Sequence, residues 1–271
     1  MRLLLLADGS VGNQIAKYLM DFYPADLSLI VTTGINDIFS EAEKKRLPVR
    51  VFDSEDSLLS AVDHDIDLGV LAWWPKILKP PLLRFPRNGF VNTHPSLLPH
   101  NRGKHYNFWA LVEQAPFGVT LHCVDSGVDT GDIIAQKSID YDWCDTGETL
   151  YKKAQVAMLE LFLETYPLLR SGNYKLRPQS LHDGSFHRAA ELESASKIEL
   201  DSLYRANDLL NLLRARTFPG HPGCWFEQDG SRFEVSLKIR KVNCVSDYQK
   251  FKTECVSEIN AIGKDSAITS L

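Results

Sequence analysis

The chain has 271 residues, of which 44% are hydrophobic and 24% charged, and its formal net charge at pH 7 is −5. This length allows one large domain, or a main domain with a smaller appendage, and the composition is ordinary for a globular protein. A general nucleic-acid binder is usually basic, so the negative charge disfavours that class and leaves only a local basic groove open.

The first predicted element is a buried strand over residues 3–7. Its apolar run is too short for the core of a signal peptide and ends at Asp8, and no stretch of the chain is long enough to span a bilayer. Gly9 and Gly12 then lead into an amphipathic pattern, which predicts a strand, a turn and a helix. Their spacing is only a fragment of a dinucleotide-binding fingerprint. We therefore interpret it as a tight turn, where Gly9 could offer a backbone N–H group to a phosphate.

Strands and helices continue to alternate up to residue 72. We expect strands at 27–32, 49–52 and 67–72, and helices at 38–45 and 54–62. This alternation predicts a parallel sheet with helices on both faces. Trp73, Trp74, Pro75 and Lys76 follow the last of these strands, at the end where ligands bind in open sheets, so the two tryptophans could line a pocket. A tryptophan that covers the core and an unpartnered surface lysine are the alternatives, and both stay open.

A strand over residues 89–92 leads into the central stretch of the chain, where residues 92–99 read NTHPSLLP. Asn92 and His94 are two residues apart, so on a strand they face the same side. A carboxamide can hold an oxyanion and an imidazole can move a proton, and both suit acyl transfer. Asp129, further along, could supply a carboxylate that sets the state of His94 if the fold brings it back. A lone histidine beside a proline-rich turn is more often structural, so spacing alone leaves both interpretations open.

The segment from residue 101 to residue 139 joins the two parts of this candidate site. Arg102 and Lys104 precede a predicted helix over 106–112, which makes either an anion site or a solvated charged loop. Strands are predicted at 118–124 and 133–139 as a hairpin-like pair. The loop between them carries Asp129, so this return could bring it to His94.

The last third of the chain changes in character. A long amphipathic helix is predicted over 149–170, followed by a helix at 202–216, a rigid turn at 218–223 and strands at 224–226 and 233–242. We therefore expect a catalytic domain at 1–175, a C-terminal subdomain at 176–245 and a polar tail at 246–271. The five cysteines are scattered without Cys-x-x-Cys spacing, which argues against a disulfide framework and a zinc site and favours a cytoplasmic location.

Two motifs together resemble the folate-dependent formyltransferase family. The hallmark of that family is an Asn-x-His-x-Ser-Leu-Leu-Pro segment followed by an aspartate in a Val-Asp-x-Gly-type loop. Both occur here in order, as NTHPSLLP at 92–99 and VDTG at 128–131. The resemblance extends from the first strand to residue 242. It implies an α/β fold with a Rossmann-like N-terminal domain and a smaller C-terminal helix-plus-β subdomain, with Asn92, His94 and Asp129 as the catalytic residues.

The resemblance also implies the substrates. Residues 101–113 and 213–219 look like those of the nucleotide-sugar N-formyltransferases. The expected reaction moves a formyl group from N10-formyltetrahydrofolate to dTDP-4-amino-4,6-dideoxyglucose, for bacterial surface glycans such as the O-antigen of lipopolysaccharide. No metal is expected, because the folate already carries an activated formyl group. The alternatives are a methionyl-tRNA formyltransferase and a non-catalytic folate- or nucleotide-sugar-binding module. The amine position and the nucleotide stay open.

Binding residues follow from the same resemblance. The folate is expected near a turn and a loop made by Ser96, Leu97, Leu98, Pro99 and Asp125. The sugar nucleotide is expected near Gly9, Trp74, Pro75, Lys76, Gly103, Lys104, His105, Tyr106, Asn107, Phe218 and Trp225. Phe218 and Trp225 could stack on the base or simply belong to the core. A homodimer is expected, with neither a nucleic-acid nor a membrane partner.

Overall fold

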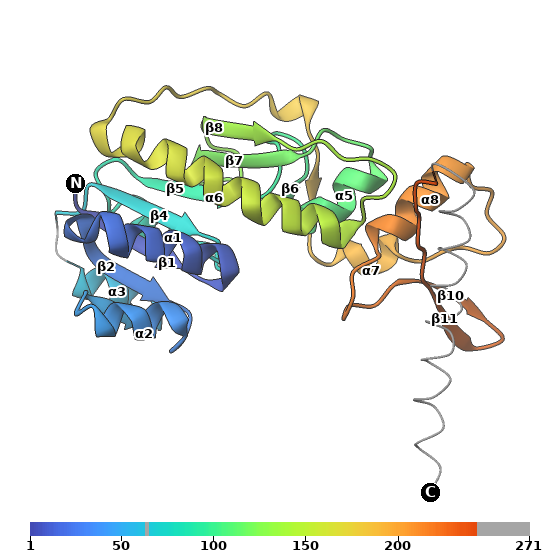
Figure 1. Ribbon diagram of the computed structural model, residues 1–271, viewed down its shortest axis with the longest axis horizontal. Coiled ribbons are helices and arrows are strands. Elements are labelled where there is room, and N and C mark those ends of the chain that lie inside the picture. The colour runs from blue at the N-terminus through green and yellow to red at the C-terminus, as the bar shows by residue number, and fades with distance from the viewer. Residues whose placement is uncertain (63–64, 243–271) are drawn as a thin grey trace, which may run out of the picture. The chain divides into compact units, whose positions relative to one another are not determined.

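The computed structural model describes residues 1–62 and 65–242 (Figure 1). Residues 1–141 and 145–237 form one compact unit, and residues 142–144 and 238–242 belong to a second unit. The predicted tail at 246–271 lies outside the described residues, as do Cys244 and Cys255. Among the residues described, no helix is both long enough and apolar enough to cross a membrane.

A seven-stranded sheet forms the centre of the larger unit, with strand order β3-β2-β1-β4-β5-β7-β8. Its strands are β1 (Leu3–Ala7), β2 (Leu27–Thr32), β3 (Val49–Val51), β4 (Leu68–Ala72), β5 (Phe90–His94), β7 (Gly118–Cys123) and β8 (Ile133–Ser138). Neighbours from β3 to β5 pair in parallel, whereas β7 pairs antiparallel with both β5 and β8. The predicted parallel sheet and the predicted hairpin-like pair beside it are both confirmed.

Helices cover both faces of this sheet, because alternate side chains of its strands point to opposite sides. Leu3 and Leu5 of β1 pack in the core cluster that includes α1 (Gly9–Phe22) and α6 (Gly147–Ser171), and Ile38 of α2 (Asp37–Lys44) joins them. Leu4 and Leu6 pack in a second cluster with α3 (Glu55–Ala61) and α4 (Pro80–Leu83). Figure 1 shows α6 lying along β7 and β8 beside α1. An unbroken apolar strand is therefore buried on both faces.

The long helix α6 begins and ends at clear local signals. Thr146 and Thr149 form a capping box, in which each side chain bonds the other residue's backbone N–H. Gly172 ends the helix in the left-handed conformation, with φ of 69°, which glycine adopts without strain. The predicted long helix is confirmed, with its first turn starting at Gly147.

The remaining elements are short. They are 3₁₀ turns at Pro24–Asp26 and Leu181–Asp183, helices α5 (Tyr106–Val112), α7 (Glu191–Ala195) and α8 (Ala206–Ala215), and strands β6 (Arg102–Gly103), β9 (Phe186–His187), β10 (Cys224–Gln228) and β11 (Ser231–Val235). β6 and β9 pair in parallel, and β10 and β11 form an antiparallel hairpin.

Most predicted elements end within two residues of the observed ones, and two differ by more. The helix expected from residue 202 begins at Ala206, because Arg205 is still extended, with φ −67° and ψ 134°. The strand expected at 233–242 runs instead from Ser231 to Val235. Val235 pairs with Cys224, the first residue of β10. The ladder stops there: the N–H of Gly223, the next residue back, donates to the Glu234 side chain at 3.2 Å, and Pro222 before it has no N–H to give. The domain boundary after residue 175 stays a prediction.

Candidate active site

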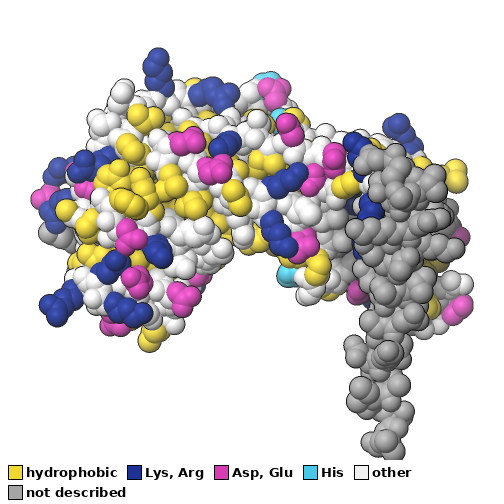
Figure 2. Space-filling model, viewed as in Figure 1, with side chains coloured by type: hydrophobic (Ala, Val, Ile, Leu, Met, Phe, Trp, Pro, Cys, Tyr) yellow, Lys and Arg dark blue, Asp and Glu magenta, His cyan; other side chains and the backbone are white. Residues whose placement is uncertain are grey.

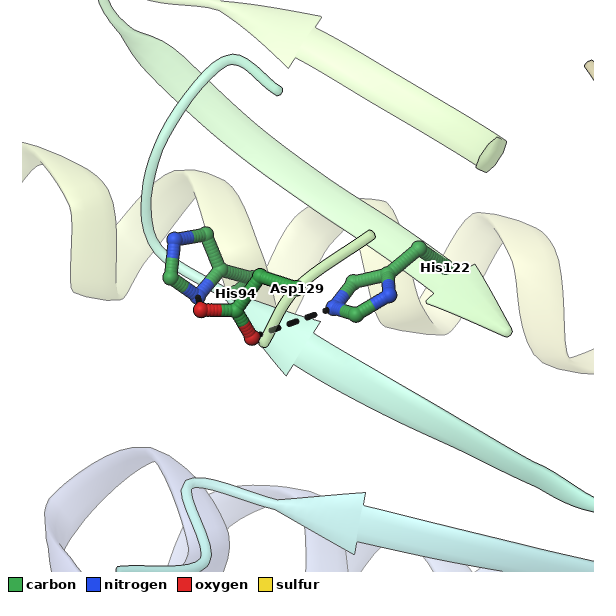
Figure 3. A group of neighbouring side chains, drawn as sticks. All are labelled: His94, His122 and Asp129. Carbon is green, nitrogen blue, oxygen red and sulfur yellow. Dashed lines mark ion pairs between the residues drawn. The ribbon is translucent and has the colours of Figure 1, made fainter. Parts of the chain in front are cut away.

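Two neighbouring strands and one loop build the candidate site. β5 carries Asn92 and His94 near its carboxyl end, and β7 places His122 directly opposite Asn92. These three side chains face one side of the sheet, because paired residues share a face and residues two apart on a strand do too. The loop between β7 and β8 brings Asp129 back to them. Figure 3 shows the Asp129 carboxylate between the two imidazole rings.

The three residues predicted to be catalytic come together. Asp129 Oδ2 is 3.4 Å from His94 Nδ1, and Asp129 Oδ1 is 3.7 Å from His122 Nε2. Asn92 Nδ2 lies 3.3 Å from His122 Nε2 and 3.5 Å from Asp129 Oδ1. A carboxamide, two imidazoles and a carboxylate are therefore clustered around Asp129, with both Asn92 and His94 within 3.5 Å of its carboxylate. Their catalytic roles stay a prediction.

His122 is a site residue that the sequence interpretation missed. Its Nδ1 lies 2.8 Å from the carbonyl oxygen of Cys123, which can only accept, so Nδ1 carries the proton. Burial lowers the pKa of His122 to about 4; the neighbouring His94 adds to this effect and the Asp129 carboxylate opposes it. The ring is thus neutral at pH 7, and its Nε2 can accept from Asn92. The available signal was the alternation of Thr120 and His122 with apolar residues in this strand, which places both polar side chains on one face.

Asp129 is held as a carboxylate. Burial alone would raise its pKa, but His94, His122 and the Gly103 N–H together lower the pKa below its usual value. The Gly103 N–H donates to Asp129 Oδ2 at 3.0 Å. The backbone of Asp129 has a φ of 53°, an unusual conformation for a residue other than glycine, so the loop is shaped around this position.

His94 has one ring nitrogen committed and one free. Its Nδ1 faces Asp129, whereas its buried Nε2 has no hydrogen-bond partner among the described residues. An unpaired buried polar atom is costly in a native protein. Nε2 is therefore the atom left to exchange a proton with a ligand.

The residues predicted to hold the folate divide into two groups. Ser96 and Leu98 are buried, and the Ser96 hydroxyl donates to the carbonyl oxygen of His100 at 2.8 Å. Thr120 Oγ1 donates to the Ser96 carbonyl oxygen and accepts from the Leu98 N–H, which fixes the turn. Leu97 and Pro99 are half-buried. These side chains shape the turn, and their contact with a folate stays a prediction.

Asp125, the remaining folate candidate, organises the loop that carries Asp129. Its side chain is exposed to solvent, and its Oδ1 accepts from the Gly127 N–H at 3.0 Å and from the Thr130 hydroxyl at 2.6 Å. These bonds close the loop in an Asx-type turn.

Of the two tryptophans after β4, one packs in the core and the other lies beside the Gly9 turn. Trp74, the predicted ligand residue, packs in the second core cluster against Phe52, with ring centroids 5.5 Å apart. Trp73 has a φ of 58° and lies beside Gly9, where a Cβ atom would be 3.2 Å from the indole. The Gly9 N–H donates to the Asp8 carboxylate at 2.8 Å, so in this structure it is not free for a phosphate. The sequence interpretation considered both tryptophans and chose Trp74, whereas Trp73 is the one that lies beside Gly9 at the carboxyl end of the strands.

A row of aromatic rings links Trp73 to the C-terminal part of the chain. Trp73 and Tyr151 have ring centroids 6.2 Å apart, and Tyr151 and Phe218 have theirs 5.6 Å apart. The predicted ligand residue Phe218 therefore belongs to a row that starts at the end of β4. Trp225 instead lies in the β10–β11 hairpin, where Arg232 stacks over its ring at 4.1 Å.

The other predicted sugar-nucleotide residues lie on two loops. Pro75, Lys76 and Lys104 are exposed, and Gly103, His105, Tyr106 and Asn107 are half-buried. Gly103 contacts Asp129 directly, and the Tyr106 ring is 6.2 Å from that of His94. Burial, Arg216 and Lys104 lower the pKa of His105. The Asn107 side chain donates to the Gly147 carbonyl oxygen at 2.8 Å.

The site also has the donor set of a metal centre. Within the described part of the chain, ligand atoms of His94, His122 and Asp129 all lie within 4.8 Å of one another. Two imidazoles and a carboxylate are ligands that zinc accepts. The expectation that the reaction needs no metal stays a prediction.

Comparison with known proteins identifies two regions of the chain. A family described as "Formyl transferase" matches residues 36–165, and "N-formyltransferase dimerization C-terminal domain" matches residues 191–241. A methionyl-tRNA formyltransferase from Thermodesulfovibrio yellowstonii is 35% identical over 155 residues, covering 56% of this chain and 48% of the relative. A dTDP-4-amino-4,6-dideoxyglucose formyltransferase from Mycobacterium tuberculosis is 28% identical over 149 residues, covering 55% of this chain and 63% of the relative. The chain thus spans about half to two thirds of these relatives.

Solved structures match over more of the chain. A sugar N-formyltransferase from a Shewanella species aligns with a TM-score of 0.73 at 24% identity, covering 90% of this chain and 99% of that one. A formyltransferase from Anoxybacillus kamchatkensis, in complex with UDP-4,6-dideoxy-4-formamido-L-AltNAc and tetrahydrofolate, aligns with a TM-score of 0.53 at 28% identity. That alignment covers 78% of this chain and 97% of the other.

Proposed function

Because the chain belongs to the formyltransferase family, we propose that it transfers a formyl group from N10-formyltetrahydrofolate to the amine of a nucleotide-linked amino sugar. The observation that carries this proposal is the cluster at the ends of β5 and β7. There the Asn92 carboxamide, the His94 imidazole and the Asp129 carboxylate meet. Such a set can stabilise an oxyanion and accept a proton without forming a covalent bond to substrate.

Each of the three residues has a separate task in this proposal. The folate supplies a formyl carbon, which the sugar nitrogen attacks; the new C–N bond forms and the bond from that carbon to N10 breaks. Asn92 donates to the oxyanion with the N–H that in the free site lies 3.5 Å from Asp129 Oδ1, while its other N–H stays with His122. Removing one such donor typically costs about 100- to 1,000-fold in kcat. His94 Nε2, which is buried and unpartnered, accepts the proton from the attacking amine. The proton is then returned to N10 of the leaving tetrahydrofolate.

Asp129 sets the orientation of His94. Its Oδ2 faces His94 Nδ1 at 3.4 Å, so the ring keeps Nε2 toward the reacting groups. The negative charge also stabilises the imidazolium that forms when Nε2 takes the proton. His122 holds the Asn92 amide from the other side, because its unprotonated Nε2 lies 3.3 Å from Asn92 Nδ2. The carboxamide is thereby oriented before substrate arrives.

The acceptor we favour is a dTDP-linked 4-amino-4,6-dideoxy sugar. Supporting this are the relative from Mycobacterium tuberculosis and the Anoxybacillus structure, whose ligand is also a 4-formamido nucleotide sugar. The row formed by Trp73, Tyr151 and Phe218 offers aromatic surface for a base or sugar. A role in O-antigen synthesis, a cytoplasmic location and homodimers formed through residues 191–241 belong to the same proposal.

A methionyl-tRNA formyltransferase is the second candidate, because relatives of that name match at 35% and 30% identity. A tRNA reader needs several lysine or arginine contacts to phosphate. The formal net charge of this chain is −5. On the face drawn in Figure 2, basic and acidic side chains are interspersed over the described residues. Charge therefore favours the sugar nucleotide.

The experiment incubates the protein and N10-formyltetrahydrofolate with a panel of acceptors. The panel holds dTDP-linked and UDP-linked sugars with the amine at C3 or C4, glycinamide ribonucleotide, and methionyl-tRNA. Mass spectrometry detects the addition of one formyl group. We expect product from a dTDP-linked 4-amino sugar. Product from methionyl-tRNA alone, or from glycinamide ribonucleotide alone, would overturn the proposed substrate class.

A further inference from the structure

A segment between the two matched regions lies against both loops of the candidate site. We call residues 177–187 the strap; the matched regions end at 165 and begin again at 191. The backbone of Arg177 pairs with that of Ile133 through two hydrogen bonds of 2.8 and 2.9 Å. The Gln179 side chain donates to the carbonyl oxygens of Asp129 at 3.0 Å and Gly131 at 2.6 Å. The first half of the strap thus holds the backbone of the loop that carries the carboxylate.

The second half of the strap holds the loop around Gly103. The N–H of Arg102 donates to the carbonyl oxygen of Ser185, and the N–H of Lys104 donates to that of His187, both at 3.0 Å. In a strand ladder, N–H groups of successive residues point to opposite sides. The Gly103 N–H, between these two, therefore points away from the strap, and it donates to Asp129 Oδ2 at 3.0 Å. The ladder with the strap aims this amide at the carboxylate.

Gly103 fits this place because it has no side chain. Its φ is 89°, and a Cβ atom there would overlap the carbonyl oxygen of His187. The loop and the strap thus approach each other more closely than another residue would allow.

Glu113, the residue after α5, connects the strap to the loop around Gly103. Its Oε1 is 2.6 Å from His187 Nε2. Its Oε2 accepts from Ser185 Oγ at 2.7 Å and from Asn101 Nδ2 at 2.8 Å. One carboxylate therefore bonds two residues of the strap and one residue of the loop. Hydrogen bonds to an ionised acceptor are roughly twice as strong as neutral ones.

The His187 ring is held on its other sides as well. It stacks on the Trp109 indole, with ring centroids 3.7 Å apart and an interplanar angle of 8°. Its Nδ1 lies 3.3 Å from Glu191 Oε2 of α7, and only 12% of the side chain is exposed. The ring is thus contacted on one face and at both nitrogens, with Glu113 at Nε2.

We propose that Glu113 is a positioning residue for the Asp129 carboxylate. By holding Ser185 and His187 of the strap, it keeps the Gly103 amide aimed at Asp129 Oδ2. Its part in formyl transfer rests on the function proposed above, whereas its effect on the Gly103 amide does not.

The first test observes the Gly103 amide without any substrate. Selective ¹⁵N-glycine labelling leaves only the chain's 16 glycines in the spectrum, so Gly103 can be assigned by mutation of its neighbours. In E113A we expect the Gly103 amide proton to move upfield and to exchange with solvent about 10-fold faster or more, since the bond to the carboxylate is weakened. E113Q, which keeps one acceptor oxygen, should fall between wild type and E113A.

A matched control separates this effect from the loss of any ion pair. Glu160 lies 2.6 Å from Lys137, the same distance as that between Glu113 and His187, and Glu160 is bonded to neither the strap nor Gly103. E160A should leave the Gly103 amide as in wild type. An unchanged Gly103 signal in E113A, or an equal change in E160A, would overturn the proposal.

The second test is kinetic. We expect E113A to lower kcat about 10- to 100-fold, because a misplaced catalytic group can cost that much, while KM for both substrates stays within about twofold. E113Q should recover part of the loss, and E160A should match wild type. A rise in KM with unchanged kcat would contradict positioning of the carboxylate. If wild type transfers no formyl group while the Gly103 signal responds as expected, the proposed function fails and the positioning role stands.

Discussion

A single carboxylate at the centre of the site has three kinds of partner: two imidazoles, a backbone N–H and the Asn92 carboxamide. Asp129 faces His94 and His122 and accepts from the backbone of Gly103, and these contacts keep it ionised although it is largely buried. His122 differs from His94, because its Nδ1–H is given to a carbonyl oxygen and its ring stays neutral. Two histidines on one face of the sheet can therefore have different tasks, one orienting Asn92 and one exchanging a proton.

The neutral state of His122 has a consequence for stability. Its pKa is about 4 in the folded protein and about 6.5 in the unfolded chain. Between these values the unfolded chain binds a proton that the folded protein does not. Stability therefore falls as the pH drops from 6.5 to 4, and this group adds nothing further below pH 4. His122→Gln should remove on the order of 3 kcal/mol of that pH dependence.

Urea unfolding at pH 7 and at pH 4.5 measures this difference. His182→Gln is the control, since the side chain of His182 is 84% exposed. If wild type and His122→Gln lose the same stability between the two pH values, His122 is not buried in its neutral form.

At the scale of elements, one buried carboxylate ties the end of α6 to the 3₁₀ turn at Pro24–Asp26. Asp26 is 3% exposed and accepts from Arg170 Nε at 2.7 Å and from the Tyr166 hydroxyl at 3.0 Å. Burial alone would raise the pKa of Asp26, but these two hydrogen bonds lower the pKa below its usual value. The pair fixes α6 against the strand β2 that follows the turn.

Asp26→Asn should lower the free energy of unfolding at pH 7 by about 3 kcal/mol, because it breaks a buried, charge-assisted contact. The contribution of Asp26 is present above the pKa of about 3.9 of the unfolded chain and is lost as the pH falls through the lower pKa of the folded protein. The gap between wild type and variant should therefore narrow below about pH 4. Asp21→Asn, at a surface pair with Lys45 of 2.8 Å, should lower the free energy of unfolding much less, because solvent screens that pair. Chemical denaturation of wild type and Asp26→Asn at several pH values measures this gap in the free energy of unfolding. A gap that widens in acid would contradict the account.

Elements with a long repeating pattern could be predicted from the sequence. The buried run of β1 and the apolar stripe of α6 are set by their own residues. β6 and β9 could not be predicted, because each is two residues long and exists only through the pairing of Arg102 with Phe186 and of Gly103 with His187. Elements defined by a distant partner leave no periodicity in the sequence.

The same distinction applies to the site. Asn92, His94 and Asp129 were predicted because their motifs have a fixed spacing, and the structure brings them together. The choice between Trp73 and Trp74 could not be made, because alternation along a strand says which residue faces which side only while the backbone stays extended. Trp73, with a φ of 58°, leaves that conformation.

At the scale of the whole molecule, the C-terminal region carries apolar side chains that the single chain leaves exposed. Leu203 is fully exposed, and it lies within residues 191–241, the range matched by a dimerization domain. A second copy of the chain would remove this surface from water, and each Å² of apolar area buried in this way contributes about 25 cal/mol to the free energy of association.

Leu203→Glu should therefore weaken the proposed dimer at least 10-fold in dissociation constant, since an unpaired charge at an interface is costly. Ile35→Glu is the matched control, because Ile35 is 79% exposed and lies outside that range. Light scattering coupled to size-exclusion chromatography, over a dilution series, measures both. Equal dissociation of the two variants, or none in either, would remove Leu203 from the interface.

The most direct measurement compares single-turnover formyl transfer by wild type and His94→Asn, with substrate binding measured alongside by calorimetry. Asparagine keeps a polar side chain at this position but cannot accept the proton. We predict that both proteins bind the folate and the sugar nucleotide within about threefold, while the variant transfers formyl at least about 100-fold more slowly. Transfer by the variant at the wild-type rate would contradict the account, because the imidazole beside Asp129 would then have no part in the reaction.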